Sequence, residues 1–359
     1  MSSMIGKNIR ISIFGQSHSK AIGIVMDGLP AGESIDLDKV NAFMARRRPG
    51  QGILTTARSE EDLPDIVSGL AGGKTCGAPL CALIANKDTH PQDYEQLKIH
   101  PRPGHADYTA WCKFGKSADY SGGGHFSGRL TAPLAFAGAV CLQILEKENI
   151  AVGAHIASVG DIQDQRFDPV NVTAAELKTV SAKAFPVCSD EAGKKMMELI
   201  QTVRAEKDSI GGTIECAATG IPAGIGSPMF DGIENRLAAA LFGIPAVKGL
   251  EFGAGFEASR LKGSENNDAF YSLDGTVKTR TNHHGGILGG ISSGMPILFR
   301  AAFKPTPSIG LPQNTVDLET GENTKLEITG RHDPCIVVRA VPVVEAVTAF
   351  TLLDMIMDK

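Results

Sequence analysis

The chain has 359 residues, of which 42% are hydrophobic and 21% are charged, and its formal net charge is −5. These values are typical of a folded globular protein, and they exclude a disordered chain or one that attracts polyanions through an overall positive charge. A composition with Trp 1 and Tyr 4 offers little base stacking, which argues against binding of single-stranded nucleic acid.

The cysteines and the apolar runs exclude two further classes. The composition has Cys 7, an odd number with no CxxC pair, so the pattern does not suggest a disulfide framework. The N-terminal segment lacks a long apolar stretch, and no run reaches about 18 apolar residues. We therefore expect a cytoplasmic protein that does not associate with membranes.

In the first half of the chain the pattern predicts three strands and two helices. Alternation predicts strands over residues 10–14 and 22–26, and an apolar run predicts a buried strand over 80–85. Asp36 or Asp38 is expected to cap a helix that ends near residue 48, before Pro and Gly. Its last turn carries three arginines, which would complement the helix dipole even without a function. Residues 131–145 are apolar nearly all round, which indicates a helix buried within the fold.

The second half begins with a more polar segment, residues 160–190, which we expect to be peripheral. An apolar stripe at helical spacing predicts an amphipathic helix over 190–204. A strand over 212–218 and a helix over 231–241 are expected next. The last predicted element is an apolar helix over 343–357 that follows Pro342.

Two glycine motifs occur twice in the same order. Residues 28–32 read GLPAG and residues 220–224 read GIPAG, while the pattern GGxxxGxP starts at residue 72 and again at residue 289. A repeat this long indicates two related halves rather than a solenoid. We predict one α+β domain over residues 1–359, with pseudo-two-fold repeats at about 10–150 and 205–357.

Four patches combine glycine with ionisable side chains, at residues 15–18, 46–50, 102–129 and 330–334. In the third patch, Pro and Gly separate Arg102 from His105, and three consecutive glycines follow at 122–124. An arginine fork suits carboxylates and phosphates, histidine titrates near neutral pH, and glycines let the backbone approach a ligand. Together the patches predict a site for a substrate with several negative groups. Taken alone, each patch could instead be structural, and an isolated RPGH or arginine run is more typical of a solvated turn or a helix end.

Other common sites do not fit the sequence. His283 and His284 are adjacent, and neither HxxxH nor a cysteine cluster at zinc spacing occurs, so no metal site is expected. No GxxxxGK[ST] phosphate loop is present, and residues 285–290 do not match GxGxxG. On the residues alone, a phosphate-ester binding or transfer enzyme stays open.

The patches resemble those of the chorismate synthase family. The similar stretches are residues 15–18, 46–50, 102–108, 122–131, 282–294, 304–308 and 330–339, in the family's order and over nearly the full length. The resemblance implies a β-α-β sandwich, a homotetramer and reduced FMN as cofactor. It also implies a carbon–oxygen lyase reaction, in which 5-enolpyruvylshikimate-3-phosphate loses phosphate and a proton by anti-1,4-elimination to give chorismate. This is the last step of the shikimate pathway to the aromatic amino acids.

The resemblance also implies roles for individual residues. His18 would protonate the departing phosphate, His105 would support the reduced flavin by proton donation, and Asp333 would assist the flavin. The implied substrate-binding residues are Arg47, Arg48, Arg102, Arg129 and Arg331. The implied flavin contacts are His125, Phe126, Ser127, Ala246, Gly289, Lys304, Pro305, Thr306, Pro307, Ser308 and Arg331.

The sequence departs from the usual family pattern beside the site. The family's GESHG reads GQSHS here, and its GGRSSARET reads GGHFSGRLT, so that His125, Phe126 and Leu130 replace an arginine, a serine and a glutamate. An arginine common after RRRPG is missing, with Ile53 or Leu54 near its place. These changes leave open whether NADPH reduces the flavin on this enzyme. They also motivate an alternative, a catalytically silent relative that binds the shikimate-pathway intermediate.

Overall fold

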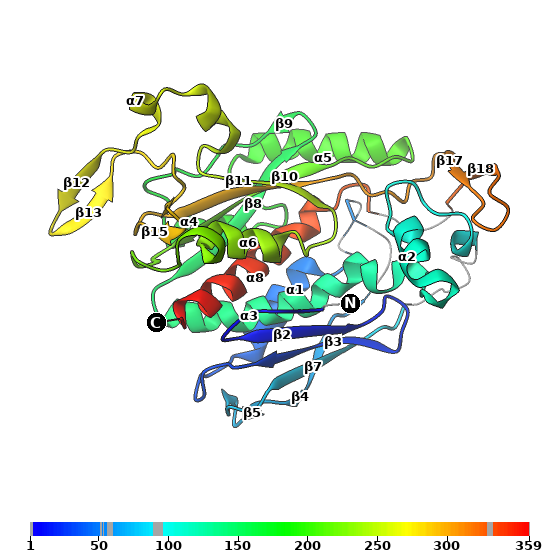
Figure 1. Ribbon diagram of the computed structural model, residues 1–359, viewed down its shortest axis with the longest axis horizontal. Coiled ribbons are helices and arrows are strands. Elements are labelled where there is room, and N and C mark those ends of the chain that lie inside the picture. The colour runs from blue at the N-terminus through cyan, green and yellow to red at the C-terminus, as the bar shows by residue number, and fades with distance from the viewer. Residues whose placement is uncertain are drawn as a thin grey trace.

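The computed structural model describes residues 3–50, 52, 54–55, 60–88, 96–328 and 333–358. Two antiparallel sheets enclose a layer of helices, with both termini between the sheets' levels (Figure 1). The architecture is α+β, as the sequence pattern predicted, and it has the β-α-β sandwich that the family resemblance implied.

The first sheet has the strand order β1-β2-β3-β7-β4. Its strands are β1 (Met4–Ile5), β2 (Arg10–Gly15), β3 (Ala21–Asp27), β7 (Leu80–Ala85) and β4 (Pro64–Ser68). The strands predicted over 10–14, 22–26 and 80–85 are therefore confirmed. Their inward side chains, among them Ile11, Ile24 and Ile84, are fully buried against the helices.

The second sheet has the order β11-β16-β10-β8-β9. Its strands are β11 (Val247–Phe252), β16 (Ile297–Phe303), β10 (Gly212–Thr219), β8 (Ala151–Val159) and β9 (Ile162–Gln163). Strand β8 was not predicted, because its glycine and alanines carry weak strand propensity. Its long pairing with β10 and its almost complete burial impose the strand instead.

The helices between the sheets supply most of the core. They are α1 (Leu37–Arg47), α3 (Thr131–Lys147), α6 (Ile233–Leu241) and α8 (Val337–Ile356). Helices α3 and α8 pack so closely that a Cβ on Gly138 would overlap the backbone of Ala346. The helical segment Gly128–Lys147 is long and apolar enough to cross a membrane, but 83% of its 18-residue apolar window is buried inside the fold, as in a core helix.

The remaining elements are peripheral. Three outer helices are α4 (Ala174–Ser181), α5 (Asp190–Ala205) and α7 (Gly263–Asn266). A fourth, α2 (Asp107–Phe114), follows the Arg102 loop. The hairpins pair β5 (Leu70–Ala71) with β6 (Lys74–Thr75), β12 (Phe270–Leu273) with β13 (Thr276–Thr279), β14 (Ile287–Leu288) with β15 (Ile291–Ser292), and β17 (Gln313–Val316) with β18 (Asn323–Leu326). Helix α7 and the β12–β13 hairpin project away from the sandwich, opposite α2 and β17–β18 (Figure 1).

Two helix ends differ from or refine the predictions. Asp36, rather than Asp38, caps α1, since its carboxylate accepts from the N–H groups of Asp38 (2.9 Å) and Lys39 (3.2 Å). The last helix does not start after Pro342 as predicted: it starts at Val337, with Pro342 inside it. The buried valines of its first turns pack into the helix layer, and this packing outweighs the hydrogen bond that proline cannot donate.

The repeated glycine motifs form the same local structure in both halves. In the first, the Thr75 hydroxyl donates to the carbonyl of Pro30 at 2.5 Å. In the second, the Ser292 hydroxyl donates to the carbonyl of Pro222 at 2.6 Å. Each bond ties the GxPAG turn to the GGxxxGxP turn of its own half. The division into repeats at about 10–150 and 205–357 stays a prediction, and this matched geometry favours it.

Candidate active site

Arg102 and Asp107 form a buried ion pair at the start of α2. Arg102 Nε donates to Asp107 Oδ2 at 2.7 Å, and Nη2 donates to Oδ1 at 2.8 Å. The backbone N–H of Arg102 also donates to Oδ2, at 3.0 Å. Both side chains are almost fully buried, so this loop is not the solvated surface turn that was the alternative interpretation. The ion pair fixes the direction in which the guanidinium points.

His105 shares the same carboxylate. Its Nδ1 lies 2.6 Å from Asp107 Oδ1 and 3.1 Å from Arg102 Nη2. Burial lowers the pKa of His105, and the positive charge of Arg102 lowers it further, against the opposing effect of Asp107. Burial alone would raise the pKa of Asp107, but its hydrogen bonds with Arg102 and His105 outweigh burial and lower it. The loop therefore holds a carboxylate, a guanidinium and a neutral imidazole near pH 7.

The glycine run lies against two of the predicted histidines. Gly122, Gly123 and Gly124 have φ of +61°, +89° and +53°, in the region that favours glycine. A Cβ on Gly122 would overlap the His18 ring, and a Cβ on Gly123 would come within 3.1 Å of Cε1 and Nε2 of His105. The absence of side chains at these positions leaves room for both rings.

The segment at 304–308 packs on the same loop. Lys304 Nζ donates to the carbonyl of Gly104 at 2.8 Å, and Ser308 Oγ accepts from Arg102 Nη1 at 3.2 Å. Thr306 Oγ1 is buried and has no hydrogen-bond partner within the part of the chain that the structure describes. A lysine and a buried hydroxyl without a described partner suit a ligand with a phosphate and hydroxyl groups, so these residues fit FMN. Ala246, whose carbonyl accepts from Lys304 N at 3.0 Å, lies beside this segment.

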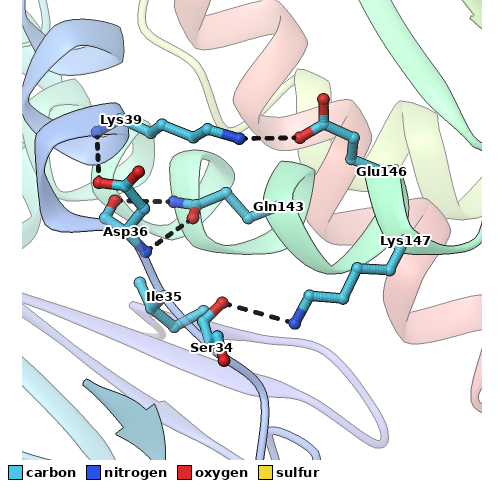
Figure 2. A pocket seen from close by; sticks show the side chains of 7 residues that line it. All are labelled: Ser34, Ile35, Asp36, Lys39, Gln143, Glu146 and Lys147. Carbon is cyan, nitrogen blue, oxygen red and sulfur yellow. Dashed lines mark hydrogen bonds and ion pairs between the residues drawn. The ribbon is translucent and has the colours of Figure 1, made fainter. Parts of the chain in front are cut away.

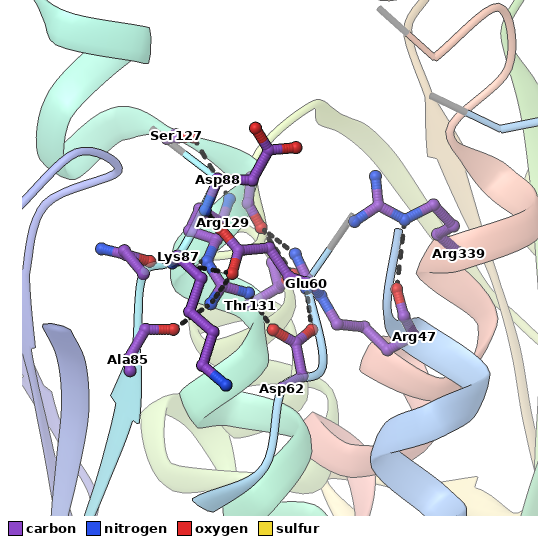
Figure 3. Close-up of polar contacts among 12 residues, drawn as sticks. Arg47, Glu60, Asp62, Ala85, Lys87, Asp88, Ser127, Arg129, Thr131 and Arg339 are labelled. Carbon is purple, nitrogen blue, oxygen red and sulfur yellow. Dashed lines mark hydrogen bonds and ion pairs between the residues drawn. The ribbon is translucent and has the colours of Figure 1, made fainter. Parts of the chain in front are cut away.

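Arg47 and Arg129 lie in a second buried cluster around Asp62 (Figure 3). Arg47 donates to Asp62 Oδ2 (2.7 Å), Thr131 Oγ1 (3.0 Å) and the carbonyl of Gly128 (3.0 Å). Arg129 donates to the other oxygen of Asp62. Burial lowers the pKa of Arg47 to about 9. Burial alone would raise the pKa of Asp62, but the guanidiniums of Arg47 and Arg129 outweigh it, so the pKa of Asp62 is lowered. In this conformation both guanidiniums are bound by protein groups.

The remaining predicted polar site residues belong to neither the Arg102 loop nor the Asp62 cluster. The backbone N–H of Arg48 donates to the carbonyl of Met44 at 3.2 Å, and its side chain is exposed, with no hydrogen bond or ion pair to another described residue. Asp333 Oδ2 accepts from Arg339 Nη1 at 2.6 Å, and Arg339 Nε donates to the carbonyl of Arg47 at 3.1 Å, which connects Asp333 with α1. Arg331 and Ile53 fall outside the described residues.

Positions 125–127 are used by the protein itself. His125 bonds to the carbonyl of Gly15 through Nδ1 and to Ser3 Oγ through Nε2, each at 2.8 Å. Ser127 Oγ accepts from the N–H of Arg129 at 3.2 Å, and Phe126 is exposed. Of the three, Phe126 offers the freest side chain to a ligand.

Gly289 lies far from the other predicted flavin contacts in this chain. It sits in the β14–β15 turn beside the start of α6, where Ile233 N donates to the carbonyl of Gly290 at 2.9 Å. Strand β16 separates this turn from Lys304, and its seven residues span roughly 23 Å at 3.3 Å per residue. The structure thus brings Lys304 but not Gly289 to the Arg102 loop.

Three polar residues of the site were not singled out from the sequence. Asp107 holds Arg102 and His105, and Asp62 holds Arg47 and Arg129. Asn86 donates to the carbonyl of Ser19 at 2.8 Å and accepts from Arg129 Nε at 2.9 Å, so it connects the His18 loop with the second cluster. The His-x-Asp spacing of 105 and 107 was a readable signal, whereas Asp62 and Asn86 meet their partners only through the fold.

A surface pocket of about 490 Å³ lies elsewhere, between the start of α1 and the end of α3 (Figure 2). Its polar groups already have partners: Lys39 pairs with Glu146 at 3.3 Å, Gln143 exchanges hydrogen bonds with the Asp36 backbone, and Lys147 pairs with Glu33 outside the lining. None of the predicted site residues lines it. The chemistry therefore concentrates in the loops around Arg102.

Comparison with known proteins was made after this geometry was established. The family model described as chorismate synthase matches residues 9–357. A chorismate synthase of Lancefieldella parvula is 46% identical and covers 99% of this chain and 96% of its own length. The enzyme of Thermococcus gammatolerans is 47% identical, with 98% and 96% covered. A solved crystal structure of a chorismate synthase aligns with a TM-score of 0.78 at 26% identity, covering 99% of this chain and 93% of that one.

Proposed function

The chain belongs to the chorismate synthase family and is a carbon–oxygen lyase, and on this premise we propose how its residues serve the reaction. It converts 5-enolpyruvylshikimate-3-phosphate to chorismate, with loss of phosphate and of a proton at C6. The observation that carries the residue assignment is the convergence of Arg102, His105 and His18 on one glycine run. This arrangement supplies an anion-binding fork and two proton-transfer groups in the same loops.

Substrate binding is assigned to the arginines. The substrate carries a phosphate and two carboxylates, and each is a natural partner for a guanidinium. Arg102 is held in place by Asp107, and the exposed Arg48 is free to close on an anion. Arg47 and Arg129, with Arg331, complete the proposed set. For the first two, binding requires an exchange of protein contacts for substrate contacts, since Asp62 and neighbouring carbonyls now take their hydrogen bonds.

Proton transfer is assigned to His18 and His105. His18, against Gly122, is proposed to donate a proton to the departing phosphate, which makes it a weaker base and a better leaving group. His105 is proposed to exchange a proton with the flavin ring through Nε2, the nitrogen that faces Gly123. Asp333, which pairs with Arg339, is also proposed to assist the flavin.

The family requires a reduced flavin, and we propose FMN held by the segment 304–308. Lys304 would bind its phosphate, and the unsatisfied hydroxyl of Thr306 would bind a phosphate or ribityl oxygen. Pro305, Pro307 and Ser308 shape the same segment, with Ala246 beside it. When bound, reduced FMN supplies the electron chemistry that side chains lack, and the protein positions it. A separate step, with NADPH or another reductant, would keep the FMN reduced.

We further propose a homotetramer that acts in the cytoplasm on this small molecule, without nucleic acid or membrane. Large apolar side chains are exposed on the projecting β12–β13 hairpin and on neighbouring turns. They include Met229, Phe230, Phe256, Phe270 and Val277. Exposed apolar side chains gathered on one side of a molecule are typical of subunit interfaces. Their exposure in the single chain supports the proposed assembly, in which they would be buried between copies.

One assay tests this function. Purified protein, photoreduced FMN and 5-enolpyruvylshikimate-3-phosphate are mixed anaerobically, and chorismate is measured by absorbance. Turnover that depends on reduced flavin is expected. A well-folded protein that binds the substrate and forms no chorismate would instead be the silent relative, and phosphate release without flavin would indicate the flavin-independent enzyme.

A further inference from the structure

One carboxylate, that of Asp107, joins the proposed substrate arginine to the proposed flavin histidine. Its Oδ2 accepts from Nε of Arg102, and its Oδ1 contacts both Nη2 of Arg102 and Nδ1 of His105. Only 3% of this side chain is exposed. The two functional side chains therefore take their positions from the same buried group.

The distance of 2.6 Å between Asp107 Oδ1 and His105 Nδ1 fixes where the imidazole proton lies. An ionised carboxylate only accepts hydrogen bonds, so an unprotonated Nδ1 at this distance would place two lone pairs face to face. Nδ1 must carry the proton. The contact of Arg102 Nη2 with Nδ1 at 3.1 Å is then close packing, because Nη2 donates to Oδ1 at the shorter distance of 2.8 Å.

The proton on Nδ1 leaves Nε2 of the neutral ring with a lone pair. This atom faces the glycine run, where a Cβ on Gly123 would lie 3.1 Å from it. The charged groups facing the ring are Arg102, Asp107 and Lys304, and with burial their combined effect is a lowered pKa. The ring thus presents one open nitrogen toward the space beside Gly123.

We propose that Asp107 is a positioning residue: it holds His105 as the Nδ1–H tautomer, with Nε2 open toward the glycine run, and locks the Arg102 fork beside it. The carboxylate thereby makes Nε2 the nitrogen that accepts a proton and can then return it to the cofactor. It also couples occupancy of the substrate arginine to the orientation of the histidine. The kinetic part of this proposal rests on the proposed function, whereas the tautomer is a property of the free protein.

The first test needs no substitution at Asp107 and no activity. Protein labelled with ¹⁵N-histidine is studied by NMR without cofactor near pH 8, and His105→Gln identifies the His105 signals. A protonated Nδ1 and an unprotonated Nε2 are expected. An unprotonated Nδ1 with a protonated Nε2 would overturn the proposal, whatever the enzyme's turnover.

The second test uses Asp107→Asn in wild-type and His105→Gln backgrounds. Loss of the carboxylate that supports a histidine tautomer has cost about 10⁴-fold in kcat in a serine protease. We expect Asp107→Asn to lower kcat by at least about 100-fold in the wild-type background and to shift the acid limb of the pH–rate profile. In the His105→Gln background the same change should lower kcat by less than about tenfold, with the remaining effect in KM through Arg102.

A matched control separates positioning from stability. Asp354 is also a buried carboxylate paired with an arginine, Arg236, but it lies near the end of α8 and ties down the backbone N–H groups of residues 7–9. Asp354→Asn should reduce thermal stability without altering the pH–rate profile. If Asp107→Asn behaves like this control, or if its effect on kcat multiplies that of His105→Gln, Asp107 has only a structural role and the proposal is wrong.

Discussion

Two histidine–carboxylate clusters in this protein have opposite electrostatics. His105 contacts Asp107 at 2.6 Å, and His155 contacts Asp164 at 2.9 Å. The pKa of His105 is lowered, whereas that of His155 is raised to about 11. A carboxylate beside a buried histidine therefore does not by itself determine whether the ring is charged.

The difference lies in the other neighbours of each ring. Burial lowers the pKa of both, but His155 has a second carboxylate, Glu215, 2.9 Å from its Nε2. Glu215 lies directly opposite it on β10. The interactions with Asp164, Cys188 and Glu215 together outweigh the burial and raise the pKa, so the ring holds a proton on each nitrogen. His105 shares its single carboxylate with Arg102, whose positive charge acts in the opposite direction.

The two arrangements suit different purposes. Both nitrogens of His155 are engaged and its ring is fully buried, so it joins β8, β10 and the loop around Asp164. His155, Asp164 and Cys188 also have the atom types of a metal site, but the imidazolium already provides the positive charge that the carboxylates require. His105 keeps Nε2 facing the glycine run, where it can accept a proton, as a group in proton transfer requires.

Removal of the reactive ring should have the largest effect. His105→Ala is expected to lower turnover by about 10²- to 10⁴-fold, the usual range for a lost acid–base group, with little change in stability. Anaerobic turnover with saturating reduced FMN measures this, and circular dichroism checks the fold. Turnover near that of the wild-type enzyme would make His105 a structural residue like His155.

Removal of the structural ring should act on folding instead. His155→Gln leaves two carboxylates without their cation, and breaking a buried pair in this way typically costs about 3–5 kcal/mol. Urea unfolding should show this loss, while kcat per folded molecule stays within about threefold. A large fall in kcat at unchanged stability would contradict the division between the two clusters.

The raised pKa of His155 also predicts how stability depends on pH. Because its folded value of about 11 lies above the ordinary 6.5, the charged ring stabilises the fold fully below pH 6.5. This contribution is lost as the pH rises toward 11. The melting temperature of the wild-type protein should therefore fall between pH 7 and 11, and His155→Gln should lack that part of the dependence. An identical decline in both proteins would assign it to other groups.

The sequence predicted the site loops better than the contacts within them. The glycine run and the RPGH turn were recognisable because glycine and proline act locally, and the amphipathic helix at 190–204 and the strands over 10–14 and 22–26 followed from periodicity. Asp62 reaches Arg47 and Arg129 from an irregular segment, so no spacing reveals the cluster. The His155–Glu215 pair depends on the register of β8 with β10, and β8 itself forms through tertiary pairing rather than propensity.

A third histidine–carboxylate pair is expected to contribute least to the free energy of unfolding. His100 Nε2 lies 3.1 Å from Asp317 Oδ2, but both side chains are at least one-fifth exposed. Water screens such a pair, and exposed ion pairs contribute about 0–1 kcal/mol. His100→Gln should therefore change the free energy of unfolding by less than about 1 kcal/mol and leave kcat unaltered. Measured in the same urea titrations as His155→Gln, a loss of 3 kcal/mol or more would show that burial and the second carboxylate are not what separates these pairs.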